Sequence, residues 1–335
     1  MRKGNYIKSF LAGLCVFTLL FCANTSSAAR YENLNVGHLT IESSLSVQGL
    51  LQAAANTTGT VYYVDSGAPG INAIGRGKSS SKPLATLDYA IGRCVANNGD
   101  FIIVMPGHAE SIIAADGIDF DVAGITVIGL GEGSSRPAFT LSTATTADIE
   151  IDAANITIAN CVFINDIDSL AAPIDVDAAY FTMIDCDMRD DTAAKQTIRW
   201  ILGDANADNM TLIGCNNRGS DTAGATAWIT LNGADGVEII GCRSNGDFSA
   251  ANIENITAAC TDLLITKNHL ENANAVDVNI EGFAAMTGWI SFNSLRIATD
   301  GQVTWINTPG NSSLFENYGV NNDGETGILA GTPSV

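Results

Sequence analysis

Short apolar runs recur along most of the chain, and most of them end at a small or amide-bearing residue. The runs at residues 125–130, 156–161, 181–186 and 210–215 align with one another, and they are rich in Ile, Val and Thr. This composition favours short β-strands. The runs recur about every 25 residues, an interval typical of solenoid proteins built from stacked repeats.

The closing positions of these runs form one column, first of cysteines and then of asparagines. A coil of this length cannot bury its apolar face alone, so successive coils must stack. Stacked Cys fills a narrow corner and stacked Asn hydrogen-bonds along the axis, so we expect a structural ladder. Because stacked cysteines have parallel Cβ vectors, we expect reduced thiols rather than disulfides. The ladder consists of Cys161, Cys186, Cys215, Cys242, Asn268, Asn293 and Asn317.

A second column of strands precedes the ladder in most repeats. Two or three short strands in each coil, repeated along residues 116–335, predict an all-β protein, a single-stranded right-handed parallel β-helix of about eight coils. The apolar pairs of this second column are Ile149/Ile151, Ile174/Val176, Ile229/Leu231, Val276/Val278 and Val303/Trp305.

Residues 61–115 have a different pattern, which predicts an N-terminal cap. Residues 61–66 and 101–105 are apolar runs of strand type, and residues 83–95 have amphipathic helical spacing with Pro83 at the start. Proline is well tolerated at the first position of a helix. We expect a strand–helix–strand unit whose helix covers the open end of the first coil and protects its edges.

Three short motifs of this cap, together with the repeat, carry a resemblance to a known family. They are Tyr-Val-Asp-Ser-Gly at 63–67, Pro-Leu-Ala-Thr-Leu-Asp-Tyr-Ala-Ile at 83–91 and Met-Pro-Gly-His-Ala-Glu at 105–110. From about residue 60 onward the chain resembles the pectate-lyase-like superfamily of right-handed parallel β-helices. It also resembles β-helix appendage proteins of phage and environmental sequences. The first resemblance implies action on polysaccharides, and the second implies a structural role on a particle.

The N-terminal residues have the features of a targeting segment. Residues 1–29 contain Arg2, Lys3 and Lys8, then an apolar run and small residues, which predicts a signal peptide and a secreted or extracellular-surface location. If the chain comes from a phage, a virion-associated location is the alternative. No later run is long enough to cross a bilayer. Residues 30–60 alternate apolar and polar positions and predict a strand-forming extension, either an assembly element or an extra edge strand.

Charge restricts the partners. The chain has 16 basic and 36 acidic residues and a formal net charge of −20. Such a protein repels a polyanionic backbone, so we expect no nucleic-acid partner. The acidity suits either a solvated surface or calcium binding.

Four carboxylates are candidate calcium ligands. Glu150 and Asp152 alternate with apolar residues, and Asp175 and Asp177 do the same one repeat later. They should therefore form an outward-facing square with sides of about 5 and 7 Å. Carboxylates that close together either bind a cation or raise a pKa toward general-acid use. A solvated acidic stripe is the simpler interpretation, and no other cofactor is expected.

Other chemistry is weakly represented. Arg189, Arg218 and Arg243 suggest a basic column at a turn, but nothing in the sequence places them beside the carboxylates, and no catalytic lyase motif is present. Three histidines in separate segments disfavour a zinc site. Exposed tryptophans could act as sugar-stacking platforms, although tryptophan at repeat positions is more often core. The four are Trp200, Trp228, Trp289 and Trp305.

These observations predict a non-catalytic structural or adhesive β-helix protein, self-associating as a homo-oligomer on a particle or cell surface. The alternatives are a secreted calcium-dependent polysaccharide lyase or glycoside hydrolase, and a carbohydrate-binding module. A surface polysaccharide is the expected partner of an adhesive protein and of a carbohydrate-binding module. Fold alone does not decide among them.

Overall fold

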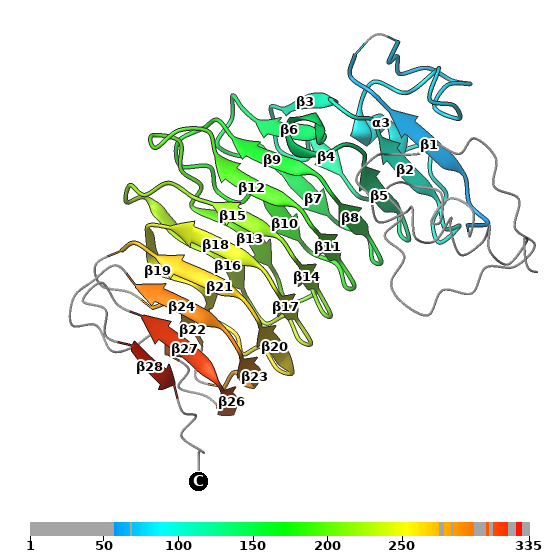
Figure 1. Cartoon of the computed structure of the whole chain (residues 1–335). Coiled ribbons are helices and arrows are strands. Elements are labelled where there is room, and N and C mark those ends of the chain that lie inside the picture. Colours follow the sequence, from blue (N-terminus) through cyan, green and yellow to red (C-terminus); the bar gives the residue numbers. More distant parts are fainter. Residues whose placement is uncertain are drawn as a thin grey trace, which may run out of the picture. The chain divides into compact units, whose positions relative to one another are not determined.

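The computed structural model describes residues 57–67, 69–274, 278–282, 285–297, 306–307, 311–320 and 326–329. All of them belong to the unit Gly49–Val335. Within this unit the chain winds in coils, and successive coils add strands to three sheets that run side by side along the stack (Figure 1). The predicted signal peptide 1–29, residues 30–56 of the predicted extension, and Val276, Val303 and Trp305 lie outside the described residues.

Sheet A carries the repeat that is visible in the sequence. It has ten strands, and each strand pairs with the next one along the stack. They are β1 (Val61–Val64), β2 (Phe101–Val104), β5 (Thr126–Gly129), β8 (Thr157–Ala159), β11 (Thr182–Ile184), β14 (Thr211–Ile213), β17 (Glu238–Ile240), β20 (Leu263–Thr266), β23 (Thr287–Ser291) and β26 (Asn311–Phe315).

Sheet B follows sheet A in each coil after a sharp corner and also has ten strands. They are β3 (Ala109–Ile112), β6 (Ala138–Leu141), β9 (Val162–Asn165), β12 (Asp187–Asp190), β15 (Asn216–Arg218), β18 (Arg243–Gly246), β21 (His269–Asn272), β24 (Ser294–Ile297), β27 (Asn317–Val320) and β28 (Thr326–Leu329).

Sheet C completes the coil with eight strands. They are β4 (Ile118–Asp119), β7 (Ile149–Ile151), β10 (Ile174–Val176), β13 (Arg199–Gly203), β16 (Ala225–Leu231), β19 (Phe248–Asn255), β22 (Ile280–Glu281) and β25 (Ile306–Asn307). The described helices are short: α3 (Leu87–Ile91) and the 3-10 turn η1 (Gly133–Ser135).

Neighbouring strands pair in parallel, and only the described pair β27–β28 is antiparallel. The register places chemically similar side chains of successive coils next to each other. Thr182 lies between Thr157 and Thr211, and Met183 lies between Ile158 and Leu212. Ile158, Met183 and Leu212 are fully or almost fully buried, because alternate side chains of each strand point into the coil. The parallel β-helix predicted from the repeat is confirmed.

Residues with left-handed backbone make the corner between sheets A and B. Asn160, Asp185, Gly214 and Gly241 have φ of 57°, 50°, 64° and 64°, and each directly precedes a ladder cysteine. Asn, Asp and Gly adopt this conformation at low cost, which explains why they recur before the cysteines. The left-handed backbone at these residues lets the chain leave a sheet A strand and enter sheet B within two residues.

The N-terminal segment departs from the predicted cap in two ways. Its strands β1 and β2 are not separate from the stack but continue sheet A in parallel register. The helix is five residues long instead of spanning 83–95, because Leu84 forms a β-bridge with Val64 and keeps residues 83–85 extended. Thr86 then caps the helix by accepting a hydrogen bond from the backbone N–H of Tyr89. Helix α3 packs against β1, β2 and β4, where sheet C ends.

The Gly-His-Ala-Glu motif maintains the geometry of this segment. His108 is buried, accepts a hydrogen bond at Nδ1 from the Ser66 N–H over 2.9 Å, and donates from Nε2 to Glu110 over 3.0 Å. The same Glu110 oxygen accepts from the N–H of Leu87 at the start of α3 over 2.9 Å. These contacts join the turn after β1 to α3 and β3, so His108 is a structural residue.

Candidate functional site

The seven ladder residues lie in one buried column at the corner between sheets A and B, and all are at most 1% exposed. The six described cysteines are free. Burial raises the pKa of the Cys186 thiol to about 12. A neutral thiol in the core is a poor nucleophile and a poor metal ligand. The column is therefore part of the packing rather than a reactive site.

A ladder of carboxylates runs along the outer face of sheet C. Glu150 is the register partner of Asp175 on one side and of Asp119 on the other. The residues that flank Glu150 and Asp175 in their strands are buried, so both carboxylates point outward. Asp152 and Asp177 follow directly after the two strands. The structure thus brings the four predicted carboxylates together, and Asp119 extends the set by one rung. We call these five residues the acidic ladder.

Two residues of the acidic ladder, Glu150 and Asp175, have strongly raised pKa values. Burial raises the pKa of Glu150 to about 8, and the charges of four neighbouring carboxylates add to the effect. Burial also raises the pKa of Asp175 to about 6, with Asp177 as the next cause. Glu150 is therefore largely protonated at neutral pH. Within the described part of the chain, one buried oxygen each of Asp175 and Asp119 has no hydrogen-bond partner.

Two carboxylate triplets have the spacing of cation ligands. Oxygens of Glu150, Asp152 and Asp177 lie within 4.8 Å of one another, and so do oxygens of Glu150, Asp116 and Asp148. Asp175 belongs to neither triplet. Asp116 was not predicted from the sequence because it lies in the loop before β4, outside the strand column. Calcium binds six to eight oxygens, so each triplet would be only part of a coordination shell.

A second polar site lies on the outer face of sheet B. Arg189 of β12 and Arg218 of β15 are direct register partners. Arg243 pairs instead with Asn216 and His269, so the predicted three-arginine column is wrong in its third member. The reason is spacing: Arg189 and Arg218 come three residues after a ladder cysteine, and Arg243 comes one residue after. All three lie on strands and not at a turn.

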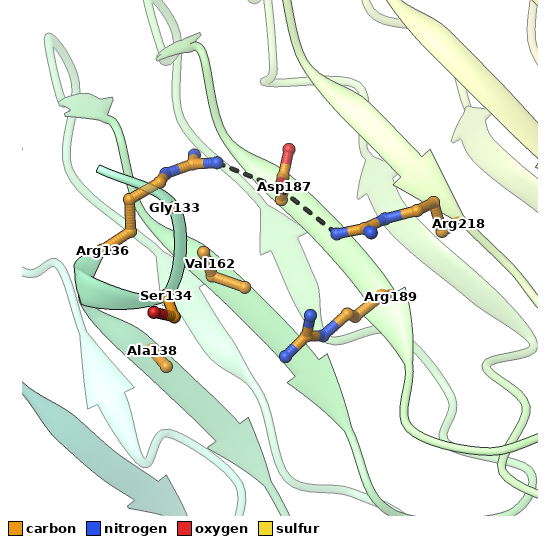
Figure 2. A pocket seen from close by; sticks show the side chains of 8 residues that line it. All are labelled: Gly133, Ser134, Arg136, Ala138, Val162, Asp187, Arg189 and Arg218. Carbon is orange, nitrogen blue, oxygen red and sulfur yellow. Dashed lines mark hydrogen bonds and ion pairs between the residues drawn. The ribbon is translucent and has the colours of Figure 1, made fainter. Parts of the chain in front are cut away.

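A third arginine completes this site and was not predicted from the sequence. Arg136 follows η1 and donates from Nη1 to Oδ2 of Asp187 over 2.9 Å, and Arg218 Nη2 lies 3.4 Å from the same oxygen. Figure 2 shows the side chains of Arg136, Arg189 and Arg218 together. They line a hollow whose volume is about 430 Å3. We call this the arginine hollow, and its lining is Gly133, Ser134, Arg136, Ala138, Val162, Asp187, Arg189 and Arg218.

The acidic ladder and the arginine hollow lie on different sheets. A calcium-dependent lyase needs its acidic metal ligands and its base on one face of the protein. In the described residues, the carboxylates face outward from sheet C and the arginines from sheet B. The part of the chain that the structure describes therefore does not form that constellation.

The tryptophans divide between core and surface. Trp200 and Trp228 are fully buried, whereas Trp289 on β23 is 61% exposed. Trp289 borders a hollow of about 370 Å3 on the outer face of sheet A, with Leu264 and Ser313 among its other lining residues. Of the four predicted stacking platforms, Trp289 is the one that the structure shows on the surface.

Comparisons with known proteins add similarities of fold. No protein-family model matches the sequence, and no curated protein does. The chain is similar to a solved rhamnogalacturonan lyase, with 14% identity and a TM-score of 0.42 over 72% of this chain and 74% of the lyase. It is also similar to the GH136 lacto-N-biosidase from Eubacterium ramulus, with 12% identity and a TM-score of 0.31 over 77% of this chain and 67% of that one.

A third similar structure is ORF18 of Geobacillus virus E2, with 11% identity and a TM-score of 0.28 over 70% of this chain and 57% of the viral one. Similarities at this level do not assign an activity. In the residues that the structure describes, no helix has the length and apolarity needed to cross a bilayer.

Proposed function

We propose that this protein is a non-catalytic structural or adhesive β-helix protein that associates with copies of itself at a cell or particle surface. The observation that carries the proposal is the outer face of sheet A, which is almost uncharged in a chain of net charge −20. The position of the acidic ladder and the arginine hollow on different sheets supports the non-catalytic part.

The outer face of sheet A consists of two neighbouring columns. Among the described outward-facing positions of β5, β8, β11, β14 and β17, Glu238 is the only charged residue. Ile213 is 39% exposed, which is unusual for isoleucine in a strand. We call this surface the Thr/Ile face, and its residues are Thr126, Thr157, Thr182, Thr211, Ile128, Ala159, Ile184, Ile213 and Ile240.

A second copy of this chain fits the Thr/Ile face better than a charged partner does. Two molecules of net charge −20 repel each other, and they do so least where neither surface carries charge. Contiguous exposed apolar patches on soluble proteins mark interaction sites. A stable interface buries about 1,200 to 2,000 Å2, and a flat face extending over several rungs at about 4.8 Å per rung offers a surface of that kind.

Light scattering over a range of protein concentrations tests the proposal. We expect an oligomer, and we expect Ile184→Glu to weaken it by placing a carboxylate in the interface. Ile164→Glu is the matched control, because Ile164 is also a partly exposed strand residue but lies on sheet B. A wild-type protein that stays monomeric at all concentrations would contradict self-association. An oligomer equally tolerant of both variants would contradict the Thr/Ile face as its interface.

Carbohydrate binding is a second candidate function, and exposed Trp289 is the observation that favours it. Indole rings stack on the apolar faces of sugars while their edges stay wet. We expect the fluorescence of Trp289 to respond to a bound oligosaccharide, and Trp289→Ala to abolish the response. Trp200 and Trp228 are buried and stay in place as internal references. An oligosaccharide response that persists in Trp289→Ala would contradict this site.

Calcium binding at the acidic ladder is a further proposal. The triplet of Glu150, Asp152 and Asp177 supports it by its spacing. The ion would offset the mutual repulsion of carboxylates on successive rungs and so stabilise the stack.

A further inference from the structure

We propose that the arginine hollow on sheet B binds a single oxyanion group, a carboxylate, sulfate or phosphate ester carried on a small molecule or a sugar. This inference goes beyond self-association and does not depend on it, because the hollow lies on a different sheet from the Thr/Ile face.

The local charge of the arginine hollow favours an anionic ligand. The hollow has three arginines and one aspartate in its lining, in a chain where acidic residues outnumber basic residues by 36 to 16. Asp187 is already shared, because both Arg136 and Arg218 approach the same oxygen. One carboxylate cannot neutralise three guanidinium groups, so the hollow carries an excess of positive charge that an anion would balance.

The guanidinium of Arg189 is available to bind a ligand. It points into the hollow in Figure 2, and it forms no hydrogen bond or ion pair with the described residues. Arg218 lies beside it in register, so two guanidinium groups from adjacent rungs border one space. Guanidinium groups bind carboxylate, sulfate and phosphate oxygens in paired, charge-assisted hydrogen bonds.

The wall of the arginine hollow is held in place before any ligand binds. The Arg136 side chain is 13% exposed, and its guanidinium also donates to the carbonyl of Cys161 at 3.0 Å and to that of Asp185. Arg136 is thereby fixed at the corner, and it holds Asp187 in turn. A rigid wall beside Arg189 reduces the entropy lost when a ligand binds.

The size and lining of the hollow restrict the ligand. A volume of about 430 Å3 falls in the range of small-molecule sites and suits one compact group rather than a polymer segment. Ala138 and Val162 give the hollow apolar surface, and Ser134 adds a hydroxyl. A long polyanion is disfavoured, because the rest of this acidic chain repels it. A single anionic substituent on a neutral or lightly charged carrier fits the small volume of the hollow and avoids the repulsion that a polyanion would meet.

Calorimetric titration with matched sugars tests this site. The probes are glucuronate, glucose 6-sulfate and glucose 6-phosphate, with glucose as the uncharged control. We expect at least one anionic sugar to bind and glucose not to bind. The anion that binds most tightly identifies whether carboxylate, sulfate or phosphate is the preferred group.

Arg189→Met should weaken that binding by about tenfold or more, since a charge-assisted hydrogen bond contributes on the order of 1.5 to 3 kcal/mol. Arg243→Met is the matched control: it removes the same charge from the same face of sheet B, but Arg243 does not line the hollow. We expect it to leave the affinity within about twofold. Absence of binding by all three anions would overturn the proposal, as would equal losses in the two variants.

Discussion

Asn268 donates a hydrogen bond from Nδ2 to Oδ1 of Asn293, one rung further along the buried corner, over 3.0 Å. The same Asn293 oxygen accepts from the backbone N–H of Asn268 over 2.9 Å. Asn293 Nδ2 in turn donates to the carbonyl of Ile265 and to Oδ1 of Asn317, both over 2.9 Å. Each amide therefore uses its donors and its acceptor within the core, and it connects consecutive rungs where a hydrophobic side chain could only fill space.

Replacing Asn293 by alanine should destabilise the protein by roughly 2 kcal/mol or more. The change removes the acceptor of the Asn268 backbone N–H and the donor to Oδ1 of Asn317, and each orphaned buried group costs about 1 to 3 kcal/mol. Chemical denaturation measures the free energy of unfolding. Asn245→Ala is the control, because Asn245 is exposed on β18. Equal stability losses in the two variants would show that the amide column contributes nothing beyond side-chain volume.

Cys186 lies in the same column but contributes through packing. We expect Cys186→Leu to destabilise the stack by about 1 to 3 kcal/mol through overpacking. Cys186→Ala is the matched change to a smaller side chain, and it should cost less because the site is narrow. An unchanged melting temperature of the leucine variant would contradict the burial of this column. The thiol should also resist alkylation until the protein unfolds, since its pKa is raised to about 12.

The repeat of sheet A could be predicted from the sequence because each rung closes with the same residue type. Sheet B was harder to predict, since its strands follow the ladder directly and carry mixed polar residues such as Arg189 and Asn217. The helix was overestimated because its amphipathic spacing begins in residues that form a β-bridge with β1. In each case a long-range pairing overrode a local preference.

The candidate sites divide in the same way. The acidic ladder could be predicted because alternation in a strand fixes which side chains point outward. The arginine hollow could not, because Arg136 comes from the loop before β6, three rungs before Arg218 on β15, and has no spacing relation to it. Such a site depends on how a loop folds back on the stack, which a repeat pattern does not specify.

Glu150 should make the stability of the protein depend on pH. Its folded-state pKa is raised from 4.5 to about 8, so between these values the folded protein binds a proton that the unfolded chain releases. By linkage, stability is fully retained below about pH 4.5 and falls as the pH rises toward about 8. Glu150→Gln mimics the protonated acid. We expect its melting temperature to exceed that of the wild type at about pH 9 and to match it near pH 4.5.

Melting curves across this pH range, recorded by circular dichroism, provide the measurement. Glu238→Gln is the control, because the register partners of Glu238 are Thr211 and Leu264 rather than carboxylates. It should leave the slope of melting temperature against pH unchanged. If Glu150→Gln also follows the wild-type slope, the ordinary pKa of a solvated glutamate applies and the acidic ladder is not coupled.

Calcium should stabilise the protein if the acidic ladder binds it, and the effect should grow with pH as Glu150 and Asp175 lose their protons. At a concentration about 100 times the dissociation constant, the gain would be about 2.7 kcal/mol. Replacing Asp175 and Asp177 together by asparagine should abolish this gain while raising the melting temperature without calcium, because two repelling charges are gone.

The control for this experiment removes the same number of charges elsewhere, with Asp221→Asn and Asp262→Asn at exposed positions. It should retain the full calcium response, and a chelator should reverse the response in both wild type and control. A calcium-induced shift that survives in the Asp175/Asp177 variant would place the ion at another site, and the triplet of Glu150, Asp116 and Asp148 would be the first to test. No shift in the wild type at about pH 8 would mean that protons alone relieve the repulsion along the ladder.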